Sequence, residues 1–135
     1  MRLEGGCYCK QVRYIAEGEP RFKAECHCRE CQYISGGGPN FFMLMPPDGF
    51  RYVSGEPKTF TRDDLAAPVT REFCPNCGTH LTTRRPGLPL VILKVGTLDD
   101  PSLYGQPQAA IFTIDKQAFH VLPVGLPAFE RMPPR

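Results

Sequence analysis

The sequence predicts an all-β fold of many short strands in a single domain. The chain has 135 residues, which fits one domain spanning 1–135. It contains 15 prolines and 13 glycines, and these residues favour turns over long helices. Its apolar residues recur in short alternating runs, which is the period of a strand that buries one face. Together these observations leave little room for helix.

The expected strands follow one another at short intervals along the chain. In the first half, strands are expected at residues 12–14, 22–26, 41–45, 50–53 and 58–60. Residues 28–34 tolerate one or two helical turns, and the glycines and proline of 35–39 then impose a loop. In the second half, strands are expected at residues 69–73, 81–83, 90–95 and 110–113. The proline-containing tail from 123 onwards is expected to lie along the surface.

Charge and hydropathy argue against several classes of function. The net charge is +2 and the basic residues are scattered, apart from the pair Arg84-Arg85, so the clustered basic stripe of a nucleic-acid-binding protein is missing. No apolar run approaches the length of a membrane span, and Met1 leads into Arg2-Leu3-Glu4 rather than a signal peptide. We therefore expect a soluble, cytoplasmic protein that binds neither nucleic acid nor membrane. Its Phe and Met residues permit a homodimer.

Seven cysteines are the strongest chemical signal in the chain. An odd number cannot all form disulfides, and thiols stay reduced in the cytosol. The cysteines fall into three tight clusters, which are Cys7-x-Cys9, Cys26-x-Cys28-x-x-Cys31 and Cys74-x-x-Cys77. Such spacing is typical of thiolates that converge on a metal ion. The sequence therefore predicts metal sites.

The seven thiolates divide into a group of four and a group of three. Structural zinc takes four protein ligands, whereas catalytic zinc keeps one position open. Residues 74–78 form the zinc-knuckle sequence CPNCG, in which the final glycine can adopt a left-handed conformation that lets backbone N–H groups point at sulfur. A knuckle supplies two ligands, and Cys7 and Cys9 are the available second pair. We expect these four cysteines to hold a structural zinc ion that joins distant strands.

Cys26, Cys28 and Cys31 remain as a compact tripod that leaves one face of the metal bare. We expect a second zinc ion here, open to water or substrate, so that the chain binds two zinc ions. The alternative is a second structural site completed by one of the three histidines, His27, His80 or His120. The nearest of these lies between two ligands, so its side chain should point away. An iron–sulfur cluster would need a fourth ligand that no cysteine supplies.

Five segments of the chain match the motifs of a known family. They are GGCYC at 5–9, CHCREC at 26–31, FCPNCGT at 73–79, VGTLDDP at 95–101 and LPAF at 126–129. Together they resemble the glutathione-dependent formaldehyde-activating enzyme family, which also includes centromere protein V, over nearly the whole chain and in the right order. The chain departs from the family pattern after Ser35-Gly36, and at 110–112, where many relatives carry a His-Ile-Trp-like strand. We expect these differences to alter the substrate pocket rather than the metal sites.

The resemblance implies a β-tent type fold of several small antiparallel sheets with two zinc sites. By this resemblance the structural ligands are Cys7, Cys9, Cys74 and Cys77, and the catalytic ligands are Cys26, Cys28 and Cys31. Counting the ligands that zinc takes leads to the same division of the cysteines into four and three. The family activity implies a zinc-dependent carbon–sulfur lyase. Such an enzyme joins a small thiol such as glutathione to formaldehyde, giving S-hydroxymethylglutathione, or cleaves that adduct.

Cations and backbone amides are the candidate substrate contacts. A substrate thiolate adds negative charge to a site that already has three thiolates, and nearby cations would offset it. The arginines that could do so, or that could bind substrate carboxylates, are Arg29, Arg51 and Arg71. The backbone N–H groups that could face an anion belong to Gly36, Gly37 and Gly38.

Two functions from other classes compete with the lyase. The chain could be a non-enzymatic zinc-binding module that recruits a partner, or a thiol or metal sensor that uses the tripod as a switch. Zinc content and the response to glutathione separate these functions. The lyase predicts two zinc ions per chain, with glutathione perturbing only the metal at the tripod.

Overall fold

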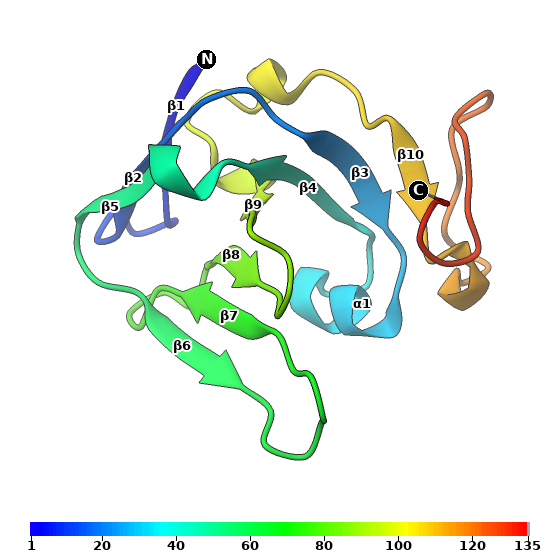
Figure 1. Cartoon of the computed structure of the whole chain (residues 1–135), viewed down its shortest axis with the longest axis horizontal. Coiled ribbons are helices and arrows are strands. Elements are labelled where there is room, and N and C mark those ends of the chain that lie inside the picture. The colour runs from blue at the N-terminus through cyan, green and yellow to red at the C-terminus, as the bar shows by residue number, and fades with distance from the viewer. Residues whose placement is uncertain (135) are drawn as a thin grey trace.

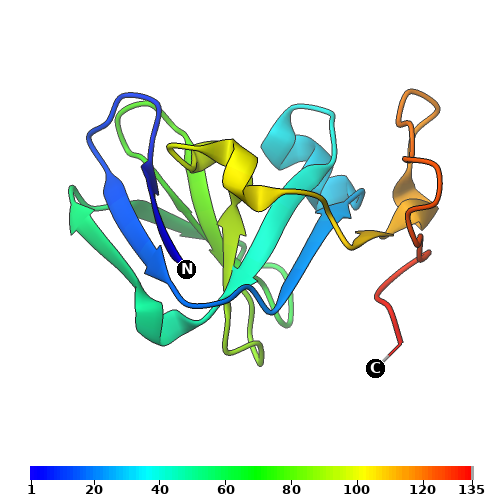
Figure 2. The same ribbon diagram turned by 90° about the horizontal axis from the view of Figure 1, so that it is seen from above.

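The computed structural model describes residues 1–134 and is built almost entirely from strands (Figure 1). Three of the strands form a small antiparallel sheet in the order β1-β2-β5. Their bounds are β1 (Arg2–Gly6), β2 (Arg13–Glu17) and β5 (Phe50–Ser54). This sheet lies at the end of the molecule opposite to the C-terminal segment, as Figures 1 and 2 both show.

The other seven strands form one mixed sheet in the order β10-β3-β4-β9-β8-β7-β6. Their bounds are β3 (Phe22–Cys26), β4 (Asn40–Met45), β6 (Lys58–Thr61), β7 (Thr70–Phe73), β8 (His80–Arg84), β9 (Val91–Lys94) and β10 (Ala109–Ile111). All neighbours pair antiparallel except β10 and β3, which are parallel. The chain reaches β10 from β9 by a crossover through short 3₁₀ turns at Val95–Thr97 and Pro101–Tyr104, and a crossover rather than a hairpin allows parallel pairing.

A hydrophobic core joins the two sheets. Tyr14 of β2 packs in it with Met43 of β4 and Leu93 of β9, all of them fully buried. Burying a side chain of the size of Leu or Met contributes about 1.5–3 kcal/mol. The thiols of Cys7 and Cys74 belong to the same core, so one cysteine group is built into the packing that holds the sheets together.

The opposite face of the seven-stranded sheet carries a second apolar cluster and the α-helix. Phe42 of β4 and Ala24 of β3 are buried there together with Cys26. The helix α1 (Arg29–Ser35) begins after Cys28, whose Sγ accepts a hydrogen bond from the backbone of Cys31, and it ends at a glycine in the left-handed conformation. The second cysteine group therefore lies between this helix and the sheet.

The predicted all-β class with little helix is confirmed, and so is the position of the helix. β1 was not expected, because its sequence RLEGG has one apolar residue and no alternation to detect. The strands form one small and one large sheet rather than several small antiparallel sheets. The large sheet arises because β4 pairs with β9 and so joins two groups of strands. In the described part of the chain, no helix is both long enough and apolar enough to cross a bilayer.

The C-terminal segment returns to β10 and pairs with it in the parallel direction. Ala110 of β10 receives a hydrogen bond from the backbone N–H of Phe129 and donates one to the carbonyl of Pro127, both 2.9 Å long. Ala110 and Ala128 form a parallel bridge. The tail expected along the surface is thus also attached to the outer edge of the large sheet.

Candidate metal centres

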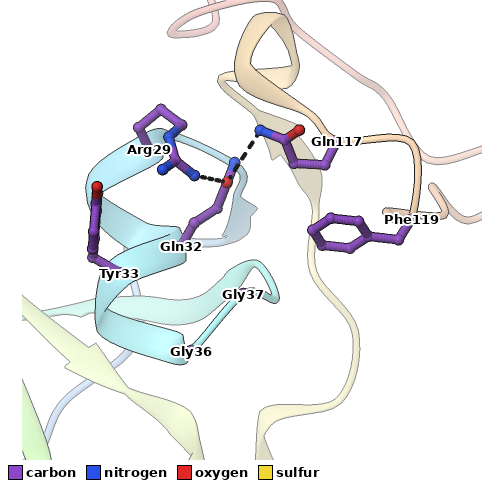
Figure 3. Close-up of a pocket in the computed structure, with 7 residues that line it drawn as sticks. All are labelled: Arg29, Gln32, Tyr33, Gly36, Gly37, Gln117 and Phe119. Carbon is purple, nitrogen blue, oxygen red and sulfur yellow. Dashed lines mark hydrogen bonds between the residues drawn. The ribbon is translucent and has the colours of Figure 1, made fainter.

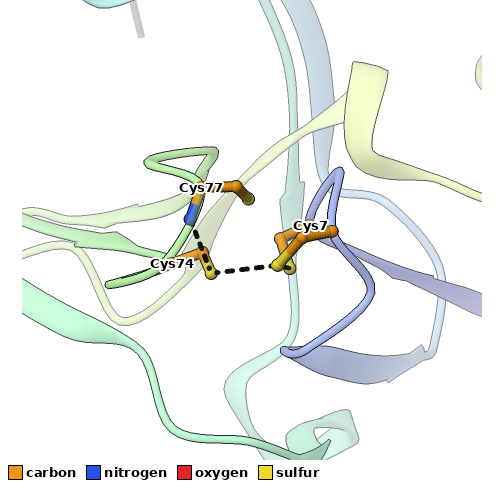
Figure 4. A group of neighbouring side chains, drawn as sticks. Cys7, Cys74 and Cys77 are labelled. Carbon is orange, nitrogen blue, oxygen red and sulfur yellow. Dashed lines mark hydrogen bonds between the residues drawn. The ribbon is translucent and has the colours of Figure 1, made fainter.

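Four cysteines from two distant turns form the first group, which we call the closed cluster: Cys7, Cys9, Cys74 and Cys77. The first two lie between β1 and β2, and the other two between β7 and β8. All four Sγ atoms lie within 4.8 Å of one another. Figure 4 shows the turn that carries Cys74 and Cys77 facing the turn that carries Cys7.

The knuckle turn adopts the conformation that its sequence predicts. Gly78 has a φ of +77°, the left-handed region that favours glycine. The backbone N–H groups of Asn76 and Cys77 donate to the Sγ of Cys74 at 3.3 and 3.4 Å. On the other turn, the N–H of Val12 donates to the Sγ of Cys7 at 3.2 Å. These donors stabilise negative charge on sulfur, which is the form that binds metal.

The closed cluster has the dimensions of a tetrahedral zinc site. With Zn–S bonds of about 2.3 Å, tetrahedral geometry separates the sulfur atoms by about 3.8 Å. The Sγ atoms of Cys7 and Cys9 are 3.6 Å apart, and those of Cys9 and Cys74 are 3.7 Å apart. The four thiols therefore fit a metal ion of this size without rearrangement.

Hydrogen bonds favour ionisation of two thiols of the closed cluster. The hydroxyl and backbone of Thr79 lower the pKa of Cys77 to about 5. The side chain of Asn76 lowers the pKa of Cys9. Both effects favour the thiolate, so the protein prepares these ligands before a metal arrives.

The second group, the open cluster, consists of Cys26, Cys28 and Cys31. Cys26 ends β3, and the other two stand at the start of α1. The three Sγ atoms also lie within 4.8 Å of one another, and no other His, Cys, Asp or Glu of residues 1–134 joins them. The cluster thus offers a metal three sulfur ligands from a stretch of six residues.

The histidines do not complete the open cluster in the described structure. His27 points away from the thiols, as its position between two ligands predicts, and its ring packs against His120 with the ring centres 5.0 Å apart. His120 is held by its own bonds, since its Nε2 lies 2.6 Å from the carbonyl oxygen of Gly37 and its Nδ1 accepts from the backbone of Gln117. His80 lies outside both groups.

The charge distribution in the open cluster is uneven. Hydrogen bonds from the thiols of Cys26 and Cys31 lower the pKa of Cys28, and its thiolate in turn raises the pKa of Cys26. Arg71 of β7 adds to the lowering at Cys28 through its positive charge. One thiolate therefore forms easily without metal, whereas ionising all three requires a further cation.

Two cations, Arg71 and Lys94, lie near the open cluster. Only Arg71 was predicted from the sequence. The side chain of Arg71 is 11% exposed, donates to the hydroxyl of Thr83 and lies 3.7 Å from a carboxylate oxygen of Glu30 on α1. Lys94 of β9 is 7% exposed, and the three thiols are among the charges that act on it. In the sequence, the one feature that points to Lys94 is its position as a lone lysine in the apolar run LVILKV.

The predicted contacts on α1 line a cavity instead. Arg29, Gln32 and Tyr33 on one face of the helix and Gly36 at its end, together with Gly37, Gln117 and Phe119, line an open cavity of about 560 Å³ (Figure 3). At 3.6 residues per turn this face is turned away from Cys31. Arg29 donates to Gln32 and packs on the ring of Tyr33. Arg29 is therefore placed on the far side of the helix from the thiols.

The glycines and Arg51 are also placed differently from what their predicted role requires. The N–H groups of Gly36 and Gly37 both donate to the carbonyl of Gln32 and end the helix, so they are not free to face an anion. Gly38 presents its carbonyl to the hydroxyl of Ser35. Arg51 lies on β5 of the three-stranded sheet and pairs with Glu17 at 3.2 Å. Of the predicted substrate contacts, Arg71 is the one beside the thiols.

Comparisons with known proteins agree with this architecture. The family model described as glutathione-dependent formaldehyde-activating enzyme matches residues 2–115. Three chains of solved structures match, among them a Rhodobacter sphaeroides protein determined by structural genomics. It is 19% identical with a TM-score of 0.59, and the alignment covers 78% of this chain and 97% of that chain, which shows a shared fold. No curated protein matches the chain.

Proposed function

The chain belongs to the glutathione-dependent formaldehyde-activating enzyme family, and from this premise we propose that it is a zinc-dependent carbon–sulfur lyase. The proposed reaction joins the sulfur of a small thiol, such as glutathione, to the carbon of an aldehyde, such as formaldehyde, or cleaves the resulting hydroxymethyl adduct. The observation that carries the proposal is the incomplete ligand set of the open cluster, which has three thiols where a closed zinc site has four ligands.

The two cysteine groups fit zinc ions with different roles. We assign a structural zinc ion to the closed cluster, whose four ligands leave no position for a substrate. We assign the reactive zinc ion to Cys26, Cys28 and Cys31. When bound there, zinc supplies a Lewis acid that favours the thiolate form of a substrate thiol at neutral pH.

The surroundings of the open cluster suit an anionic sulfur substrate. Arg71 places a positive charge beside Cys28, and its contacts with Thr83 and Glu30 hold the guanidinium in position. Apolar side chains of the sheet, Phe42 and Ile92, pack against the same thiols and limit the access of water. A low local dielectric strengthens the attraction between the cation and a substrate thiolate.

Metal content and spectroscopy test the proposal. Fully reduced protein should contain about two zinc ions per chain. After replacement of zinc by cobalt(II), glutathione should change the visible spectrum of the native protein, because the added sulfur alters the coordination of the open site. A Cys28→Ser variant should retain the closed-site spectrum and lose the response to glutathione. An empty second site in reduced protein, or a native spectrum that ignores glutathione, would contradict the lyase and leave a non-catalytic zinc-binding module.

A further inference from the structure

Lys94 is a buried cation without a protein partner. Lys94 is 7% exposed, and no side-chain hydrogen bond or ion pair of residues 1–134 involves its ammonium group, while the charges of Cys26, Cys28 and Cys31 act on it. Burial lowers the pKa of Lys94 to about 8, and the positive charge of Arg71 adds to this effect. A buried ammonium group without a partner is costly, and buried charges are normally paired or bound to a ligand. The ammonium group of Lys94 therefore keeps its hydrogen-bond donors free for an acceptor that binds beside the thiols.

The register of the sheet places Lys94 on the face that carries the open cluster. Lys94 pairs directly with Phe42, and Phe42 pairs with Ala24. Paired residues of a sheet point to the same face, as do residues two apart on one strand. Cys26, two residues after Ala24, therefore shares this face with Lys94, and Phe42 lies between them.

The neighbouring strands bring Arg71 to the same face from the other side. Ile92 lies two residues before Lys94 on β9, and it pairs with Thr83, which pairs with Arg71. Ile92, like Cys28, also packs against the apolar cluster that contains Cys26 and Cys31. The two cations thus lie on the same face as the open cluster, and Arg71 pairs with Glu30.

Among the described residues, Lys94 and Arg71 have different bonding states. Arg71 has a carboxylate at 3.7 Å and a hydroxyl at 3.3 Å, so its charge is partly satisfied by the protein. The ammonium group of Lys94 keeps all its donors for a ligand. A small acceptor that reaches the buried thiols would meet Lys94, whereas a bulky carboxylate would meet the more accessible Arg71 first. The aldehyde oxygen is an acceptor of the right size, because it lies two bonds from the reacting sulfur in the adduct.

We propose that Lys94 is a catalytic residue that donates a hydrogen bond to the oxygen of the aldehyde and of the hydroxymethyl adduct. This inference rests on the proposed lyase function. As the carbon–sulfur bond forms, the π electron pair of the C=O bond moves to the oxygen, and the proton lost by the thiol ends on that oxygen. Lys94 stabilises the negative charge while it develops and is unchanged at the end of the reaction. In the cleavage direction the same donor holds the oxygen until the C=O bond has formed again.

Kinetics of a Lys94→Met variant test this role, with exchange between glutathione and its formaldehyde adduct followed by NMR. Loss of one donor to a developing oxyanion lowers kcat by about 10²–10³-fold, and KM for glutathione should not change. A Lys58→Met variant is the matched control, because Lys58 lies exposed on the edge strand β6. The melting temperature of Lys94→Met should equal or exceed that of the native protein, since an apolar side chain replaces a buried charge. Unchanged kcat in folded Lys94→Met would overturn the inference.

A binding measurement gives a readout independent of turnover. The cobalt(II) protein is titrated with 2-mercaptoethanol and with ethanethiol, which differ by one hydroxyl group. Native protein should bind the hydroxyl-bearing thiol roughly tenfold more tightly, the value of one hydrogen bond to a charged group, and Lys94→Met should lose this preference. If Lys94→Met loses cobalt from the open site, Lys94 only balances the charge of the metal site. If the variant keeps the preference for 2-mercaptoethanol, Lys94 does not bind the oxygen.

The failures of the two proposals are distinguishable. If the lyase function is wrong, native protein leaves the exchange rate of the adduct at its uncatalysed value. If only the role of Lys94 is wrong, native protein accelerates the exchange and folded Lys94→Met accelerates it equally.

Discussion

The closed and open clusters both offer cysteine sulfur as ligand, but their cysteines are separated by very different lengths of chain. The closed cluster joins two turns separated by 65 residues between Cys9 and Cys74, and the thiols of Cys7 and Cys74 belong to the main core. The open cluster takes its thiols from one short stretch between β3 and α1. A metal at the first site therefore closes a long loop, whereas a metal at the second closes a short one. This difference is what the proposed division into a structural and a reactive site predicts.

The groups that surround the two clusters also differ in charge. The closed cluster is served by neutral donors, namely the backbone N–H groups and the hydroxyl of Thr79. The open cluster has two cations nearby, Arg71 and Lys94. A set of four thiols already has the number of ligands that a structural zinc site takes, whereas a set of three beside cations favours the arrival of another anion.

The largest expected effect comes from breaking the closed cluster. A Cys77→Ser variant should be largely unfolded, because structural zinc contributes on the order of 10 kcal/mol. This is comparable with the whole stability of a domain, about 5–15 kcal/mol. Circular dichroism and zinc content measure the outcome. A folded Cys77→Ser protein with a native melting temperature would show that the closed cluster does not hold the fold.

Breaking the open cluster should leave the fold intact. A Cys28→Ser variant should lose one of the two metals and all lyase activity, and its melting temperature should change by less than about 4 °C, equivalent to roughly 1 kcal/mol. Scanning calorimetry of zinc-loaded protein measures the shift. Equal destabilisation by Cys28→Ser and Cys77→Ser would remove the distinction between the clusters and indicate two structural sites.

The smallest expected effect concerns an ion pair that fastens the hairpin of the closed cluster. Arg13 of β2 donates two hydrogen bonds to Asp99, at 2.8 and 2.5 Å, and this lowers the pKa of Asp99. Because the carboxylate is half exposed, an Asp99→Asn variant should lose only about 0.5 kcal/mol.

The pH dependence of this ion pair has a definite sign. A lowered carboxyl pKa stabilises the folded state at all pH values above the ordinary aspartate pKa of about 3.9. The stability difference between native protein and Asp99→Asn should be constant from neutral pH down to that value and vanish as pH falls through the lowered pKa. Urea unfolding of zinc-loaded protein measures the constant part of this difference, at pH values where the thiolates keep their zinc. A loss comparable with that of Cys77→Ser would mean that the ion pair, rather than metal, holds the hairpin.

The grouping of the cysteines could be predicted from sequence because their spacing encodes local geometry. The turn at 74–78 needs a glycine at its end, and the tripod follows from three thiols within six residues. Contacts that depend on strand register could not be predicted. Lys94 faces the thiols only through the pairing of three strands, and Arg51 is separated from them because β5 joins the other sheet. Short-range sequence patterns carry no information on the position of either side chain relative to the thiols.

The attachment of the C-terminal segment to β10 determines how much of one edge of the large sheet is open to pairing. β10 is the last strand of the large sheet, and an uncovered strand edge can pair with another molecule and start aggregation. The bonds of Ala110 to Pro127 and Phe129, and that of the Phe112 N–H to the carbonyl of Arg131, occupy this edge. The prolines there interrupt the row of donors that a foreign strand would need. Residues beyond the family match at 115 therefore cover an edge of the sheet that would otherwise be open to a foreign strand.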